Sequence, residues 1–152
     1  MPAAPPVPPP GSPGLKLLNL MTKAQVAAYR ATGGRIGGRH KRAPVLLLDH
    51  VGRKSGQTRT TPLLYRRDGE DLVIVASRGG SDATPAWWLN LKASPVTTVT
   101  VGRERRRVQA QQASPDDKAR LWPELVQMFP DYAVYQTRTS RDIPVIILSP
   151  TT

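Results

Sequence analysis

Residues 43–77 read APVLLLDHVGRKSGQTRTTPLLYRRDGEDLVIVAS. Within them, three short runs rich in apolar and β-branched residues, at 43–51, 58–67 and 71–77, are separated by turns that contain glycine. Runs of this length and composition, joined by such turns, are typical of strands in an antiparallel meander. The stretch therefore predicts that the protein is built on an antiparallel β-sheet.

The rest of the chain supplies helices and three more strands. Ser114-Pro115-Asp116-Asp117 is a strong helix start, because a capping serine precedes a proline and two acidic residues. Periodicity and turn residues predict helices at 15–30, from Thr84-Pro85 to Lys92, from Ser114 to Met128 and from Pro130 to Tyr135, and strands at 96–101, 103–112 and 143–148.

The predicted elements show no alternation of strand, helix and parallel strand, which disfavours a doubly wound sheet. We expect a mainly β, α+β fold: a closed or nearly closed six-stranded antiparallel barrel with flanking helices. Residues 1–14 hold seven of the sixteen prolines and no charged side chain, so they predict a flexible tail. Residues 15–152 then form one domain that begins with an amphipathic helix.

Composition excludes several kinds of chemistry. The chain has no cysteine, which excludes disulfides, thiolate-held clusters and a catalytic thiol. His40 and His50 have only Asp49 as an acidic residue between them, so we expect no metal site and interpret both as surface or strand residues. The sequence shows neither a run approaching about 20 apolar residues nor a secretory leader, which predicts a cytoplasmic protein.

The net charge of +11 is concentrated in one segment. Residues 35–67 contain nine arginines and lysines against Asp49 alone, a net charge of +8. Such a patch suits a polyanion, which leaves nucleic acid, an anionic membrane surface or a small ligand with several phosphates or carboxylates. The basic helix at 15–30 is open to two interpretations: it packs on the domain, or it touches a membrane surface.

Four segments are candidate binding elements, and none contains a nucleophile with its base. They are the basic turn Gly52–Arg59, the glycine-containing strand exit Ala76–Gly80, the tryptophan pair in Pro85–Leu91, and the tyrosines of Phe129–Tyr135. We expect the turn's backbone N–H groups to converge on an anion. Neighbouring residues on a helix differ by about 100°, so one tryptophan should fill the core and the other border a cavity. Such a set of binding elements suits an enzyme whose cofactor performs the chemistry.

In order and spacing, the segments GRKSGQTRTTPL, VIVASRGG, TPAWWLNLKASP, WPELVQMFPDYAVYQ and IPVIIL resemble the deazaflavin-dependent nitroreductase family. The resemblance covers the chain from about residue 15 onward. It implies a split β-barrel related to the FMN-binding barrels, coenzyme F420 in its reduced form, and hydride transfer to a quinone or an activated nitro or enone acceptor. A cationic groove would then serve the phosphodiester and glutamates of the coenzyme tail.

The resemblance also implies site residues. The tail would meet Arg53, Lys54, Ser55, Arg59 and Thr60. The ring would lie against Thr61, Pro62, Leu63, Leu64, Val75, Ala76, Ser77 and Arg78, and the pocket would be completed by Ala86, Trp87, Trp88, Leu89, Asn90 and Tyr132. Ser77, Tyr132 and Tyr135 would act at the reacting face.

Two positions depart from the family pattern. Leu64 and Phe129 stand where family nitroreductases carry tyrosines, which puts activity on bulky nitroimidazoles in doubt. Tyr65, one position after Leu64, should face the other side of the strand. Beside the reductase we keep two alternatives: a non-catalytic F420 carrier, and a nucleic-acid-binding barrel, although the basic strands lack the aromatic residues that single-strand binders use.

Overall fold

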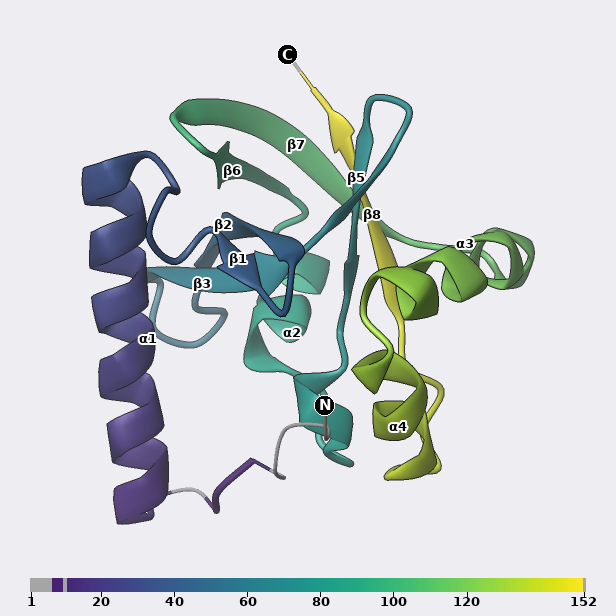
Figure 1. The fold of residues 1–152 in the computed structure, drawn as a ribbon, viewed down its shortest axis with the longest axis horizontal. Coiled ribbons are helices and arrows are strands. Elements are labelled where there is room, and N and C mark those ends of the chain that lie inside the picture. The colour runs from purple at the N-terminus through teal and green to yellow at the C-terminus, as the bar shows by residue number, and fades with distance from the viewer. Residues whose placement is uncertain (1–6, 10, 152) are drawn as a thin grey trace.

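The computed structural model describes residues 7–9 and 11–151 and shows a curled antiparallel sheet surrounded by helices (Figure 1). The sequence-based prediction of a split β-barrel is confirmed. The helices are α1 (Pro13–Thr32), α2 (Ala86–Ala93), α3 (Pro115–Met128) and α4 (Asp131–Thr137), with a short 3-10 turn η1 (Arg78–Gly80). The strands are β1 (Arg39–His40), β2 (Ala43–Val51), β3 (Thr58–Leu64), β4 (Arg66–Asp68), β5 (Asp71–Val75), β6 (Val96–Val101), β7 (Glu104–Gln112) and β8 (Val145–Pro150).

The predicted strand at 58–67 is divided in two. β3 pairs with β2 and β4 pairs with β5, and Tyr65 alone joins them. The pairing runs β4-β5-β8-β7-β6-β2-β3, with β1 also paired to β2. The first and last strands of that row are therefore consecutive in the chain, so the curled sheet is joined at its two ends through Tyr65 and not by strand pairing.

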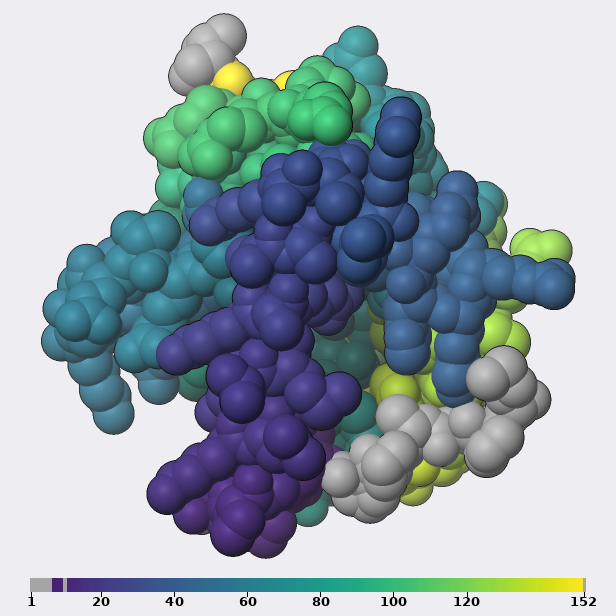
Figure 2. Space-filling model, turned by 60° about the vertical axis from the view of Figure 1, so that its left-hand side comes forward, coloured from purple at the N-terminus to yellow at the C-terminus, as the bar shows by residue number. Residues whose placement is uncertain are grey.

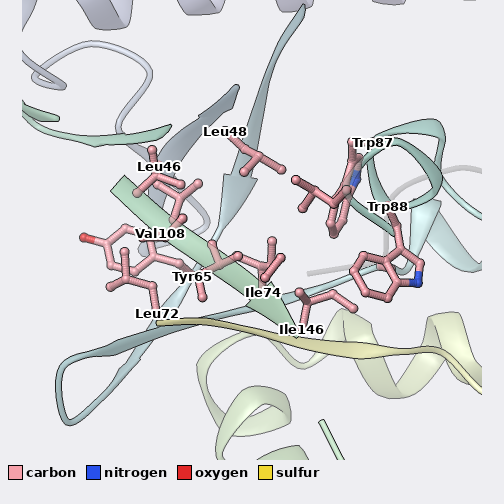
Figure 3. Packing of buried hydrophobic residues seen from close by; sticks show 14 residues of the cluster. Leu46, Leu48, Tyr65, Leu72, Ile74, Trp87, Trp88, Val108 and Ile146 are labelled. Carbon is pink, nitrogen blue, oxygen red and sulfur yellow. The ribbon is translucent and has the colours of Figure 1, made fainter. Parts of the chain in front are cut away.

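Strands β2, β5 and β8 are buried on both faces because helices cover their outer side, whereas β7 has an exposed outer face. Leu46, Leu72, Ile74 and Ile146 point into the barrel, where α2 adds Trp87, Trp88 and Leu91 (Figure 3). On the outer face, a second cluster lies under α3 and α4 and includes Val73, Val75, Leu121, Leu125 and Val145. Continuous apolar runs such as LVIV are expected where a strand is covered on both sides.

Tyr29 fixes α1 to the outer face of the sheet. Its side chain is buried against Val45 and Leu47. The hydroxyl lies 3.0 Å from the carbonyl oxygen of Val45 and accepts a hydrogen bond from the backbone N–H of Gly102 at 2.8 Å. α1 is held mainly through this C-terminal half, and its N-terminal half is largely exposed.

The helix boundaries follow local chemistry. Ser114 caps α3 by accepting a hydrogen bond from the N–H of Asp117, as the sequence predicts. Ser12 caps α1 in the same way, so α1 begins at Pro13 rather than Leu15. Residues 1–6 and 10 of the expected tail lie outside the described residues. At α2 the expected cap differs, because Pro85 occupies the cap position and no side chain caps the helix.

Candidate cofactor site

The basic turn between β2 and β3 presents charged side chains, and most of its backbone N–H groups already donate within the protein. Arg53, Lys54 and Arg59 are exposed. The cradle of N–H groups that the sequence suggests is at most partial, because the backbone N–H groups of Gly52, Arg53, Gly56 and Gln57 already donate within the protein. The turn can therefore bind an anion chiefly through guanidinium and ammonium groups.

Asn90 anchors the start of this turn. Its Oδ1 accepts one hydrogen bond from the backbone N–H of Arg53 and another from the Arg53 guanidinium, each at 3.1 Å. His50, which we had interpreted as an ordinary strand residue, is buried beside Asn90 and is also hydrogen-bonded to Thr61. These contacts join α2 to the turn, although the two segments are 37 residues apart.

The residues of β3 predicted to line one pocket are divided between the two faces of the sheet. Thr61 and Leu63 point toward the barrel interior and α2, whereas Leu64 packs on the outer face against the clusters of α1 and α4. Thr60 also lies on the outer side, where it donates to Asp49 at 2.8 Å and accepts from Arg30 at 2.9 Å. Such a division is unavoidable, because successive strand residues face opposite ways.

Phe129, Tyr132 and Tyr135 form an aromatic group against the outer face of β5. The ring centroids of Phe129 and Tyr132 are 5.0 Å apart, and those of Tyr132 and Tyr135 are 6.3 Å apart. Burial raises the pKa of both tyrosines above the usual 10, and the nearby Asp131 carboxylate adds to the shift of Tyr135. Both phenols therefore remain protonated at neutral pH and can donate hydrogen bonds.

The β1–β2 turn holds the start of α4 in place. The ammonium of Lys41 lies 2.6 Å from the carboxylate of Asp131, and the rings of His40 and Phe129 are 5.7 Å apart. Lys41 and Arg42 both have positive φ, at 47° and 70°. Two such residues make the tight hairpin turn that directs Lys41 toward α4, at a conformational cost for side chains with a Cβ.

Arginines from the segment after α4 fix the strand exit that carries Ser77. The Arg141 guanidinium donates to the carbonyl oxygens of Ala76, Ser77 and Ser81 at 3.2, 2.9 and 2.8 Å. Arg138 donates to the carbonyl of Gly79 at 3.1 Å. The Ser77 hydroxyl has no hydrogen-bond partner among the described residues, so it is available to a ligand.

Gly80 serves the packing of α4, not the close approach of a ligand that the glycines had suggested. Its φ is +83°, and a Cβ there would lie 2.6 Å from the carbonyl oxygen of Tyr135. Only glycine allows this loop to come so close to the helix.

Both tryptophans of α2 belong to the core, which corrects the expectation that one borders a cavity. Trp87 and Trp88 are 6% and 5% exposed, with ring centroids 6.5 Å apart (Figure 3). Both fit because α2 lies within the curl of the sheet.

The other contacts predicted on this side differ in burial: Ala86 is exposed, Leu89 and Arg78 are half-buried, and Ala76 is buried inside. The direct contact of the two indoles with the coenzyme stays a prediction.

The residues that remain accessible fit an anionic cofactor with a flat ring. Cationic side chains gather at the basic turn, and the nearest acid, Asp49, is already engaged by Thr60 and by two arginines at 3.6 Å. Leu64, which is half-buried, supplies apolar surface, whereas Val75 and the hydroxyl-bearing Ser77 are largely covered, at 5% and 9% exposed. Figure 2 shows a hollow beside α1 with teal and yellow-green atoms at its floor, from the middle of the chain and the α3–α4 region.

The comparisons with known proteins agree with this chemistry. Residues 21–150 match the family model for F420H(2)-dependent quinone reductases. An F420H(2)-dependent quinone reductase of Mycobacterium tuberculosis is 46% identical over 140 residues, which cover 90% of this chain and 91% of that protein. A solved F420-H2 dependent reductase is 34% identical with a TM-score of 0.64, over 70% of this chain and 94% of its own. Another solved structure, a domain-swapped dimer, is 30% identical with a TM-score of 0.67. The match covers 88% of this chain and 98% of that one.

Fold and sequence together define the class of protein: a split-barrel oxidoreductase with four helices around a curled antiparallel sheet. The chain belongs to the F420H(2)-dependent quinone reductase family, and its hydride donor is reduced coenzyme F420. The predictions of the cofactor, the enzyme class and quinone reduction are thereby confirmed, and catalysis is favoured over the alternative of a carrier.

Proposed function

We propose that the basic turn holds the anionic tail of reduced F420, and that its ring and a quinone occupy the outer face of the sheet between Leu64, Ser77 and the tyrosines of α4. The observation that carries this placement is the order of three groups of residues along and beyond β3. Exposed cations lie at one end of β3, Leu64 lies at the other, and Leu64 packs against the cluster that contains Tyr132 and Tyr135.

When bound, the reduced coenzyme supplies a hydride to the acceptor. The protein's own residues then have three tasks. Arg53, Lys54 and Arg59 neutralise the tail. Leu64 provides apolar contact for a flat ring and is itself supported by the cluster that contains Val75. The Ser77 hydroxyl and the protonated phenols can donate hydrogen bonds to a carbonyl oxygen on which negative charge develops, in a site from which the aromatic group excludes water.

The placement is tested by titrating the purified protein with F420 while following the coenzyme's fluorescence, and then measuring turnover of a menadione-like quinone. Tight binding together with quinone-dependent oxidation of the reduced coenzyme supports the proposal. Removal of the Ser77 hydroxyl in Ser77→Ala should lower turnover more than coenzyme affinity. Isolation of the protein with stoichiometric FMN, or equal turnover in Ser77→Ala, would contradict the assignment of the site.

We further propose that α1 touches an anionic membrane surface, from which a lipid-soluble quinone could reach the site. Within the described part of the chain, no helix is long and apolar enough to cross a membrane. Leu17, Leu20 and Met21 are about 60% exposed, at 58%, 64% and 60%. Their spacing puts them on one helix face, and Lys16 and Lys23 lie nearby, which suits a helix in the interface plane.

Sedimentation with vesicles tests this contact. The protein should bind vesicles that contain phosphatidylglycerol and should bind phosphatidylcholine vesicles weakly. Leu17→Asn with Leu20→Asn should reduce the binding, whereas Ile36→Asn, an exposed apolar residue outside α1, should not. Equal binding by all three proteins would exclude α1 as the contact.

A further inference from the structure

A chain of buried hydrogen bonds connects Thr61 on β3 to Arg53 in the basic turn. His50 and Asn90, which form its centre, are 4% and 3% exposed. The Nε2 of His50 lies 2.8 Å from the Thr61 hydroxyl, and its Nδ1 lies 2.9 Å from the Asn90 amide nitrogen. The amide oxygen of Asn90 accepts both hydrogen bonds of Arg53.

The donors and acceptors of this chain permit one protonation state of His50. Because Arg53 can only donate, the Asn90 oxygen must face it, and the Asn90 amide nitrogen, which can only donate, must face His50. The Nδ1 of His50 is therefore an unprotonated acceptor, and the neutral ring carries its proton on Nε2, from which it donates to Thr61. A second proton on Nδ1 would place two donors against each other.

Asn90 has no orientation that satisfies a protonated His50 and Arg53 together. If its amide turned to offer the oxygen to the imidazolium, the amide nitrogen would face the two Arg53 donors. Because a buried polar group without a hydrogen-bond partner destabilises the protein, this conflict has a free-energy cost. A proton on His50 and a fixed Arg53 are thus mutually exclusive.

We propose that His50 and Asn90 are positioning residues for the coenzyme: the neutral imidazole orients Asn90, which fixes the start of the basic turn, and protonation of His50 releases the turn and weakens coenzyme binding. The inference rests on the proposed placement of the tail at this turn. It adds a pH-sensitive element to the basic turn, whose cations otherwise act through fixed charge.

The surroundings of His50 keep it neutral at physiological pH. Burial is the largest cause that lowers its pKa below the usual 6.5, and the Arg59 guanidinium, opposite it on β3, acts in the same direction. Asp49, next to it on β2, raises the pKa. Arg53 lies beyond Asn90. Neither α2 nor β6 contains another ionisable residue except Lys92, whose ammonium lies over the Trp88 ring.

The decisive comparison uses the chain's only two histidines. In His50→Asn, the amide oxygen can take the place of Nδ1 as the acceptor for Asn90, but the side chain cannot be protonated. His40→Asn is the control for the second histidine, because His40 is exposed on β1, contacts the Phe129 ring and takes no part in the hydrogen bonds from Thr61 to Arg53. F420 affinity is measured for all three proteins between pH 7.5 and pH 5, so that any titration of the ligand is common to them.

As the pH falls, we expect wild type and His40→Asn to lose F420 affinity relative to His50→Asn. The loss should be roughly tenfold, which corresponds to the loss of one hydrogen bond to a charged group. In Asn90→Asp, the carboxylate can accept from Arg53 and from an imidazolium at once. That variant should raise the pKa of His50 and retain its affinity at pH 5. Nitrogen NMR of the coenzyme-free wild type should show the Nε2–H tautomer at pH 7.5.

Three results would overturn the inference: the same pH dependence in His50→Asn as in wild type, the Nδ1–H tautomer in the NMR spectrum, or a loss of affinity at pH 5 in Asn90→Asp equal to that of wild type. Failure of the proposed function has a different signature. The wild-type protein would then not bind F420 even at pH 7.5, where His50 is neutral, and that result would overturn both proposals.

Discussion

Replacing Tyr29 by phenylalanine should destabilise the protein by removing one hydroxyl while leaving the ring in place. That hydroxyl accepts from the N–H of Gly102 at 2.8 Å and lies 3.0 Å from the carbonyl of Val45. Tyr29 is 1% exposed, so water cannot readily replace it on the Val45 side. Gly102 is half-buried in its turn, so water can solvate its N–H in part.

The expected cost follows mainly from those two contacts, because the third, with the carbonyl oxygen of Thr100, is longer at 3.3 Å. A buried group left without its hydrogen bond costs about 1–3 kcal/mol, and partial hydration of Gly102 reduces its share, which gives about 2 kcal/mol in all. For a chain of this size, that loss lowers the melting temperature by about 4–8 °C. Urea denaturation followed by circular dichroism measures the free energy, and a thermal scan measures the temperature.

Tyr65→Phe is the matched control. Tyr65 is also buried, at 8% exposure, but its hydroxyl has no hydrogen bond to any described residue. Its loss should change the free energy of unfolding by less than about 0.5 kcal/mol, the usual size of a change that removes no specific contact. Equal losses in the two variants, or no loss in Tyr29→Phe, would refute the assignment of α1's anchor to this hydroxyl.

Three further results are expected. Lys54→Ala with Arg59→Ala should weaken F420 binding at least tenfold, in a salt-dependent way, without changing stability, because both side chains are exposed. Gly80→Ala should destabilise the protein by about 1–3 kcal/mol in urea denaturation, since its φ is positive and its Cβ would collide with the backbone of α4. The enzyme should reduce quinones but have little activity on bicyclic nitroimidazoles in a coupled assay, and Leu64→Tyr with Phe129→Tyr should raise nitro activity more than quinone activity.

Each of these expectations has an outcome that contradicts it. Unchanged affinity in the double mutant would put the coenzyme tail elsewhere. Gly69→Ala is the control for Gly80, because Gly69 also has positive φ but has open space around its Cβ position. If both glycine variants lose the same stability, the contact with α4 contributes nothing beyond backbone strain. Turnover of a nitroimidazole as fast as that of a quinone would show that the missing hydroxyls do not set substrate choice.

The fold was predictable because its signals are local. The glycine turns, the Ser114-Pro115 helix start and the alternation of Thr and Val at 96–101 each act over a few residues. The helices and strands that these signals predict lie at the predicted positions. The division of 58–67 at Tyr65 was not predicted. It depends on pairing with two different partners, β2 and β5, which no local pattern records.

The candidate site was predicted less completely, for the same reason. The sequence indicates the basic turn, but not that Asn90 holds it from 37 residues away. Arg141 gives no sequence signal for its three carbonyl contacts, and Lys41 meets Asp131 across 90 residues. The burial of both Trp87 and Trp88 requires sheet around α2 on more than one side. Helical periodicity, which assumes one buried face, predicts otherwise.

The single residue between β3 and β4 has a consequence for how the barrel opens. In a row of strands, the two outermost members ordinarily fray independently and leave an unpaired edge on which another chain can add. Here both outermost strands are tethered through Tyr65, whose side chain is buried in the core. Separation of β3 from β2 therefore disturbs the residue that leads into β4. Amide exchange of the two strands should be cooperative, with β3 and β4 exposed to solvent in one event.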